Sequence, residues 1–263
     1  MEGAGLVDAP AAVRALLGWF DQNGAELPWR ATRDRYAVLV SEVMLQSTQV
    51  ARVVPFYERW MSRWPTAPAL AAAPLGEVLA QWQGLGYPRR AKNLHRAAAM
   101  VSDTGWPDRL EDLPGVGRYT AAAIRCFADE QDVIPVDVNV ERVLARRWPD
   151  GWPGTSAGRE WATGQAFMDF GRTVCTARDP ACDRGCVLRP GCPAAETGRV
   201  VEVTPIRRPQ GRFAGSMRQR RGRLLAAIAA EGRIELATDP QAAESLIADG
   251  LARRGRKFLL PAP

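Results

Sequence analysis

The segment Leu113-Pro-Gly-Val-Gly-Arg-Tyr-Thr120 constrains the fold of this chain more than any other stretch. Helical patterns at 108–113 and 118–129 flank it, so the chain must turn between two helices. Gly115 and Gly117 permit a tight turn that leaves backbone N–H groups free at the start of the second helix. Such N–H groups, together with the helix dipole, bind anionic phosphate. The segment therefore predicts a helix pair that grips a nucleic-acid backbone.

A lone carboxylate follows this turn in the segment Pro135-Val-Asp-Val-Asn139. Asp137 lies eighteen residues beyond Tyr119. A carboxylate held near a gripped strand is what cleavage of a sugar–base bond needs. The pair of motifs is compatible with an enzyme or with a DNA-binding scaffold.

Helical patterns dominate the first 195 residues. Apolar spacing predicts further helices at 10–20, 36–64, 67–83, 89–102 and 139–148. No alternating strand pattern occurs before residue 200, so this part is predicted to be all-α.

The C-terminal part has a different pattern. Residues 196–216 contain Pro205 and Pro209 and predict a linker. A helix, a strand, a second helix and a hairpin are then predicted, at 217–230, 233–236, 240–249 and 251–260. This order is typical of a small winged-helix-like module with a basic hairpin, whose cations are Arg253, Arg254, Arg256 and Lys257.

Charge is unevenly distributed. Residues 201–263 contain 12 Arg or Lys and 6 Asp or Glu, whereas residues 1–200 contain 23 of each sign. The net charge of +6 therefore lies in the C-terminal segment, which favours attraction to a phosphate backbone. A solvated basic face explains the tail alone equally well.

Other residue types narrow the chemistry and the compartment. The chain has one histidine, His95, and two lysines, Lys92 and Lys257. Histidine-based hydrolysis and lysine phosphate clamps are therefore poorly supported. We find no export signal and no apolar run of membrane-spanning length, so we expect a cytoplasmic, nucleoid-associated protein.

Four of the five cysteines form the pattern Cys175-x6-Cys182-x3-Cys186-x5-Cys192. Disulfides do not persist in a reducing compartment, so metal ligation is the better interpretation. Four thiolates suit tetrahedral zinc or a [4Fe–4S] cluster, and the single continuous loop favours the cluster. Cys126, alone in an apolar run, is expected to be a small buried hydrophobe.

Six motifs in order now resemble one family, the helix-hairpin-helix DNA glycosylases that carry an iron–sulfur cluster, and within it the adenine-specific mismatch glycosylase (MutY) family. The motifs are Leu27-Pro-Trp-Arg30, Val40-Ser-Glu-Val-Met-Leu-Gln46, Gly84-Leu-Gly-Tyr87, Leu113-Pro-Gly-Val-Gly117, Asp137-Val-Asn-Val140 and Met168-Asp-Phe-Gly171. The likeness covers approximately residues 10–195. It implies a two-lobed, mainly α fold with a [4Fe–4S] cluster on the four cysteines.

The resemblance also implies a domain organisation. A glycosylase domain over 1–195 would consist of a six-helix barrel at 26–134 and a cluster lobe formed by 1–25 and 135–195. The linker 196–216 and the basic module 217–263 would follow.

Residue roles are implied as well. Glu42 would be the general acid that protonates the purine N7, and Asp137 would stabilise the oxocarbenium-like sugar, the same division of roles as in glycoside hydrolysis. Burial in an apolar helix would favour the acid form of Glu42. Asn139 would orient Asp137. Without the resemblance, Glu42 would more often be a partly exposed helix residue and Asp137 a helix N-cap.

DNA contacts are implied at several further positions. Tyr87 would be the wedge beside the partner base, usually 8-oxoguanine, where its alternative is an aromatic packed in a loop. Trp29, Arg30 and Leu45 would line the adenine pocket, although Trp29 suits a core position equally well. Gln46, Ser47 and Thr48 would contact the lesion strand, and basic residues of the cysteine loop would face DNA: Arg178, Arg184 and Arg189.

The sequence departs from the family in four places. Tyr119 stands where the related endonuclease III has a Schiff-base lysine, which predicts a monofunctional glycosylase. Ser47 replaces a glutamine of the family's Gln-Gln-Thr, the x3 cysteine gap is one residue longer than usual, and the short module stands in place of a large Nudix-like domain.

The predicted function is removal of adenine mispaired with 8-oxoguanine or guanine in double-stranded DNA by a monomeric enzyme. Removal of thymine or uracil opposite guanine is the alternative, motivated by Tyr119 and Ser47. A non-catalytic DNA-binding protein is a more distant one. Glu42 speaks for a purine, because pyrimidines have no N7.

Overall fold

A computed structural model of the chain describes residues 9–152, 154, 158–200 and 211–263. The chain divides into two compact units, of which unit 1 comprises residues 1–33 and 118–208 and unit 2 comprises residues 34–117 and 209–263. Residues 201–210 of the predicted linker lie outside the described residues. The predicted division into a barrel at 26–134 and a cluster lobe stays a prediction.

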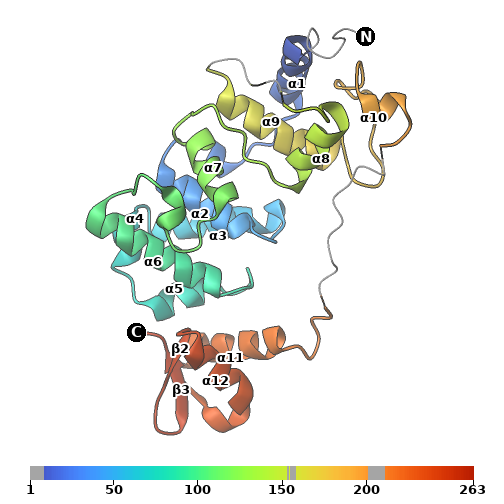
Figure 1. Ribbon diagram of the computed structural model, residues 1–263. Helices are drawn as coiled ribbons and strands as arrows, with labels where there is room; N and C mark the ends of the chain where they lie inside the picture. The colour runs from blue at the N-terminus through green and yellow to red at the C-terminus, as the bar shows by residue number, and fades with distance from the viewer. Residues whose placement is uncertain (1–8, 153, 155–157, 201–210) are drawn as a thin grey trace. The chain divides into compact units, whose positions relative to one another are not determined.

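The regular elements among the described residues of unit 1 are all helices. It contains α1 (Ala9–Asn23), a 3₁₀ turn at Pro28–Arg30, α7 (Arg118–Phe127), α8 (Val138–Arg147), α9 (Glu160–Thr173) and the single turn α10 (Pro193–Glu196). Helix α9 packs against α1, α7 and α8 (Figure 1). Leu16 and Phe167 are fully buried in this core, and Phe170 is 1% exposed. Burying such large apolar side chains is the main favourable term in folding this unit.

Helix α9 lies where the sequence pattern predicts no helix. Two glycines within it, Gly164 and Gly171, lower its intrinsic helix propensity. Both are needed for packing: a Cβ on Gly164 would lie 2.9 Å from the Phe127 ring, and a Cβ on Gly171 would lie 2.7 Å from the Asn139 carbonyl oxygen. Tertiary contact therefore stabilises a helix that its own sequence specifies weakly.

Unit 2 begins with five helices and a 3₁₀ turn. They are α2 (Arg35–Leu45), α3 (Val50–Arg63), α4 (Ala67–Ala71), α5 (Leu75–Gln81), α6 (Arg89–Thr104) and the turn at Leu110–Asp112. Helix α2 is buried from Tyr36 to Met44, so it forms the centre of this unit. Asp34 caps it by accepting a hydrogen bond from the Ala37 amide at 2.8 Å.

The continuous helical pattern predicted over 36–64 is wrong at its centre. Helix α2 ends at Leu45 and α3 begins at Val50. Ser47 between them has a φ of 57°, in the left-handed region that a helix interior does not contain. Periodicity missed this break because the apolar spacing continues across it.

The C-terminal part of unit 2 is the predicted helix–strand–helix–hairpin. It consists of α11 (Met217–Glu231), β1 (Ile234–Glu235), a 3₁₀ turn at Leu236–Thr238, α12 (Pro240–Ala248), β2 (Ala252–Arg254) and β3 (Phe258–Pro261). The sheet order is β1-β3-β2, and both pairings are antiparallel, with Ile234 opposite Leu259 and Arg254 opposite the same Leu259.

Residues Ala262 and Pro263 of this module contact the first turn of α5 in unit 2. The Leu75 amide donates to the Pro263 carbonyl at 3.1 Å, and Gly76 lies so close to Ala262 that a Cβ would be 2.9 Å from its carbonyl oxygen. The mainly helical fold class with a small C-terminal module is confirmed. Across the described residues, no helix combines the length and hydropathy that crossing a membrane requires.

Candidate active site and cysteine centre

Asp137 is held at the N-terminus of α8 by three hydrogen bonds. Its Oδ1 accepts from the backbone amides of Asn139 and Val140, each at 2.8 Å, and its Oδ2 accepts from the Asn139 side-chain amide at 2.8 Å. The residue is therefore a helix N-cap, as its sequence position alone suggests. Because the carboxylate is only half-buried, capping leaves part of it accessible to a ligand.

Arg142 fixes the other end of the Asn139 side chain. One guanidinium nitrogen of Arg142 donates to the Asn139 Oδ1 at 2.9 Å and to the Gly171 carbonyl at 2.5 Å, while its Nε donates to the Cys175 carbonyl at 2.7 Å. Arg142 is 5% exposed, and this burial lowers its pKa. A chain of side-chain contacts therefore runs from Asp137 to the backbone of the first loop cysteine.

Sequence reasoning missed Arg142. The residue stands three positions after Asn139 on α8, and the i,i+3 spacing on a helix brings such pairs together. That spacing was the available signal, but the carbonyl partners come from distant residues.

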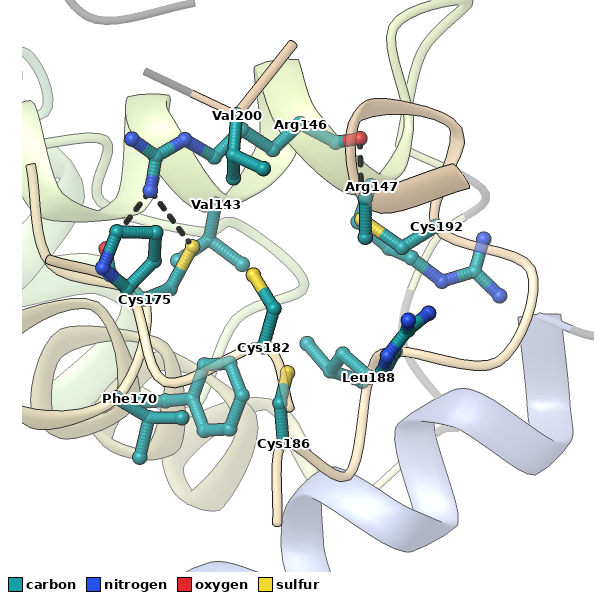
Figure 2. A pocket seen from close by; sticks show the side chains of 14 residues that line it. Val143, Arg146, Arg147, Phe170, Cys175, Cys182, Cys186, Leu188, Cys192 and Val200 are labelled. Carbon is teal, nitrogen blue, oxygen red and sulfur yellow. Dashed lines mark hydrogen bonds between the residues drawn. The ribbon is translucent and has the colours of Figure 1, made fainter. Parts of the chain in front are cut away.

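The four loop cysteines line one cavity of unit 1, and Figure 2 shows their sulfur atoms facing a common space. Apolar side chains of Val143, Phe170 and Leu188 complete its wall. Among the described residues, no three or more His, Cys, Asp or Glu side chains are placed close enough together to bind one metal ion.

Arginines of α8 attach the cysteine loop to that helix. The Arg146 guanidinium donates to the Thr176 carbonyl at 2.7 Å and lies 3.4 Å from the Cys175 Sγ, and the Arg146 carbonyl accepts from the Cys192 thiol at 3.4 Å (Figure 2). Arg147 also lines the cavity. Two buried cations thus stand beside the thiols.

Burial raises the pKa of Cys186 to about 11 and raises the pKa of Cys182 and of Cys192 as well. Desolvation therefore favours the neutral thiols. Metal ligation requires thiolates, so a bound cationic centre would have to offset this desolvation.

The loop arginines predicted to face DNA are exposed, and two of them form ion pairs within the loop. Arg184 pairs with Asp179 and Arg189 with Asp183, each at 2.9 Å. Arg178 is exposed as well. Exposed pairs of this kind are weak, so a phosphate can displace the carboxylate at small cost.

Glu42 lies on the central helix α2 and is 5% exposed. Its burial among Val40, Val43 and Met44 agrees with the predicted apolar environment.

Arg90 organises the two loops that follow α2 and α5. One of its terminal nitrogens donates to the carbonyls of Val43, Met44 and Gln46, the last at 2.6 Å. The other donates to the Leu85 and Gly86 carbonyls at 2.8 and 3.0 Å and to the Thr48 hydroxyl at 3.3 Å.

These bonds hold the segment Gln46–Thr48 and the segment before Tyr87 together. Burial lowers the Arg90 pKa to about 10, so the side chain is charged at neutral pH. Arg90 was also missed by sequence reasoning, since all its partners except the Thr48 hydroxyl are backbone carbonyls.

Tyr87 projects from a turn with a strained backbone. It is 38% exposed and has a φ of 48°, which costs a non-glycine residue about 1–3 kcal/mol. Arg90 lies 5.6 Å from the centre of its ring. This exposure fits the predicted wedge, whose ring inserts into a base stack, better than it fits the alternative of an aromatic packed in a loop.

Trp29 and Arg30 are anchored inside unit 1. Trp29 is 7% exposed, so the core position that its sequence allowed is observed. The Arg30 guanidinium binds the Asp169 carboxylate at 2.8 Å, the Gln165 side chain at 2.7 Å and the Ala25 carbonyl at 2.6 Å.

The sequence motif Met168–Gly171 supplies the carboxylate of this ion pair, Asp169. Burial by itself would raise the pKa of Asp169, but hydrogen bonds from Arg30 and the Ala25 amide outweigh it and hold the pKa below the ordinary value. The Leu27–Arg30 motif and the Met168–Gly171 motif are therefore joined through Arg30 and Asp169.

The glycine turn is formed as predicted. Gly115 has a φ of 82°, and a Cβ there would lie 2.9 Å from the Asn93 Cβ, so any other residue would be strained and would displace Asn93. The Val116 amide donates to the Leu113 carbonyl at 3.1 Å, and Gly117 directly precedes α7. Tyr119 lies half-buried in the first turn of that helix.

Three comparisons with known proteins agree with this arrangement. Residues 40–157 match the family described as HhH-GPD superfamily base excision DNA repair protein. An adenine DNA glycosylase of Mycobacterium tuberculosis is 40% identical over 283 residues, which cover 94% of this chain and 92% of that protein. Since less than a tenth of this chain is left out, the likeness extends into the C-terminal module.

Two solved structures share the glycosylase fold. A thermostable thymine-DNA glycosylase superposes with a TM-score of 0.67 at 27% identity, covering 74% of this chain and 100% of that one. An endonuclease III trapped in a covalent intermediate with DNA superposes with a TM-score of 0.61 at 25% identity, covering 75% and 99%.

Proposed function

The chain belongs to the adenine DNA glycosylases of the HhH-GPD superfamily of base excision repair, and on this premise we propose that it hydrolyses adenine from mispairs with 8-oxoguanine or guanine and leaves the strand intact. The observation that carries the proposed mechanism is the fixed carboxylate of Asp137, held by Asn139 and, through it, by Arg142.

In this mechanism Glu42 donates a proton to N7 of the extruded adenine. The bond between C1′ and N9 then breaks with its electron pair on the protonated purine, which leaves as neutral adenine. The Asp137 carboxylate stabilises the oxocarbenium-like sugar until water adds at C1′ and gives up its proton to the Glu42 carboxylate, which restores the acid. Burial of Glu42 and the hydrogen-bonded setting of Asp137 support this division of roles.

DNA is gripped and opened by the remaining predicted residues. The N–H groups at the turn Gly115–Gly117 bind a phosphate, and Tyr87 enters the base stack. Gln46, Ser47 and Thr48 contact the lesion strand, and Trp29 and Leu45 line the adenine pocket. Arg30 acts there through its anchored position, because its guanidinium is engaged by Asp169.

We expect no lyase step, because a Schiff base with the sugar needs an amine. Tyr119 offers no amine, and the two lysines lie elsewhere: Lys92 donates to the Asp249 carbonyl at 2.6 Å, and Lys257 is exposed beside β3. Without an amine nucleophile no Schiff base forms with the sugar, so strand cleavage requires added alkali or a second enzyme.

We propose a [4Fe–4S] cluster on Cys175, Cys182, Cys186 and Cys192. The donor set fits, because four thiols line one cavity and no His, Asp or Glu among the described residues lines it with them. Such a cluster is negatively charged on four thiolates, and Arg146 and Arg147 supply the compensating charge. Bound there, it would cross-link residues 175–192 as a structural centre.

The test uses purified protein and labelled duplexes containing A:8-oxoguanine, A:G, T:G or U:G. We expect adenine release from the first two, strand breaks only after hot alkali, and loss of release in Asp137→Asn. Breaks without alkali would refute the monofunctional mechanism, and reaction confined to T:G or U:G would refute adenine specificity. Absorbance of iron–thiolate charge transfer, with iron and sulfide analysis, distinguishes the cluster from zinc.

A further inference from the structure

A groove of about 810 Å³ lies within unit 2 beside Tyr87. The segment 82–88, between α5 and α6, and Arg89 at the start of α6 form one side of it, and α11 forms the other. Phe213, Arg52 and Asp249 also line it. We refer to this site as the α11 groove. None of the proposed catalytic residues lines it.

The α11 groove is strongly basic. Five arginines line it, at positions 52, 89, 218, 221 and 223, against one acidic residue, Asp249. Asp249 is already shared, because its carboxylate accepts from Arg89 and from Arg221. Arg52 and Arg223 are exposed and form no ion pair with any residue that the structure describes. The groove therefore has positive charge that no part of the described chain neutralises.

Two exposed aromatic rings stand in the same groove. Tyr87 is 38% exposed and Phe213 is 58% exposed, and large apolar side chains as exposed as these are few among the described residues. Arg218 connects them: it donates to the Tyr87 hydroxyl at 3.1 Å, and its guanidinium carbon lies 5.7 Å from the centre of the Phe213 ring. A further bond to the Gly211 carbonyl, at 2.8 Å, fixes the Arg218 side chain.

Arginines interleaved with exposed aromatic rings are the combination that binds unstacked nucleotides. The rings stack on a base, and the guanidinium groups bind the phosphates. A basic face that only keeps the protein soluble would not contain exposed rings. A surface that binds an apolar protein would not contain unpaired arginines.

We propose that the α11 groove binds an unstacked nucleotide of DNA, with its base against Tyr87 and Phe213 and its phosphates on Arg52 and Arg223. This proposal rests on the proposed function, since DNA is the ligand. It makes the C-terminal module part of the DNA-binding surface through its first helix and the residues before it, rather than through the basic hairpin alone.

The test uses the full chain with the added substitution Asp137→Asn, so that bound DNA stays uncleaved. Phe213→Leu keeps an apolar side chain and removes the ring, and Arg52→Gln with Arg223→Gln removes the unpaired charge. Arg96→Gln is the matched control, because Arg96 is an exposed arginine of α6 that does not line the groove. Thermal melting checks that each variant remains folded.

We expect Phe213→Leu to raise the Kd for an A:8-oxoguanine duplex about tenfold. The paired arginine substitutions should reduce the slope of log K against log salt by about 2. A 2-aminopurine beside the mispair should be quenched on binding, and Phe213→Leu should diminish that quenching. Arg96→Gln should leave the Kd within about twofold of the parent protein.

The proposal is overturned if Phe213→Leu changes neither the Kd nor the quenching, even where the arginine substitutions reduce the salt slope, because the groove would then contact the backbone alone. It is also overturned if no groove variant affects DNA, an outcome that would leave the groove to a protein partner. Failure of the proposed function has a separate signature: the parent protein with Asp137 intact would release no adenine, while the groove variants would still weaken DNA binding.

Discussion

At the scale of single residues, Asp137 shows how a structural and a chemical role coincide. As an N-cap it accepts two backbone N–H groups, and these same donors fix the carboxylate that the proposed mechanism requires. Its sequence position suggested the two roles as alternatives. The structure makes them compatible, because Asn139 and Arg142 fix the orientation from the other side.

We expect Arg142→Gln to lower the single-turnover rate of adenine release by about tenfold to a hundredfold, because Asn139 would lose the partner that orients it. Arg14→Gln, at an exposed position of α1 in the same unit, is the control and should have no effect. Rates measured over a pH series distinguish the two explanations. Loss of folded protein lowers the rate equally at every pH, whereas a change in the position of Asn139 alters the shape of the pH profile.

A double-mutant cycle with Asn139→Ala tests the same claim. If Arg142 acts through Asn139, the two substitutions together cost little more than either alone. Fully additive losses in rate would contradict this coupling.

Asp169 allows a prediction about pH. Its pKa is depressed in the folded chain, so the Arg30–Asp169 pair stabilises the fold above the ordinary aspartate pKa of about 4 and loses this contribution as pH falls through the lowered value. Asp169→Asn should therefore reduce the free energy of unfolding by about 3 kcal/mol at pH 7. Denaturant titrations should show the difference shrinking below about pH 4, and a difference independent of pH would disprove the assignment.

At the scale of elements, sequence patterns were most reliable where a helix or hairpin is specified by its own residues. Helices α6, α7 and α8 and the C-terminal helix–strand–helix–hairpin follow the predicted segments closely. The pattern missed α9, and it twice ran two helices together. It joined α2 to α3 across Ser47, and its helix at 67–83 is in fact α4 and α5, separated before Leu75 by Pro74. In these places a contact distant in sequence, or a backbone conformation that spacing does not encode, decides the outcome.

Gly171 gives a test of this element-scale explanation. A methyl group there would lie 2.7 Å from the Asn139 carbonyl oxygen, so Gly171→Ala should separate α9 from α8 and lower the melting temperature markedly. Gly18→Ala, in α1, is the matched control, because nothing lies within 4 Å of its added Cβ.

Gly18→Ala should instead stabilise the protein by up to about 1 kcal/mol through helix propensity. If Gly171→Ala stabilised the protein as Gly18→Ala does, close packing would not explain the glycine in α9. Gly171→Ala should also slow adenine release, because Asn139 supports Asp137.

At the scale of the whole molecule, two segments distant in sequence form unit 2. Residues 209–263 belong with the helices of residues 34–117, through the bond from Leu75 to Pro263 and the shared carboxylate of Asp249. The C-terminal module is therefore part of a folded unit rather than a separate appendage. This integration is what brings Phe213 and Arg218 to Tyr87.

The sequence by itself determined the fold class and the family, and it supplied most of the residues proposed to carry the chemistry, because these depend on local spacing and on residue types that few other chains combine. Only the tertiary structure revealed Arg142 and Arg90, which bind mostly backbone carbonyls, several of them distant in sequence, and the α11 groove, which two distant segments form together. A carbonyl has no residue identity, and a groove has no period, so neither leaves a pattern in the amino-acid sequence.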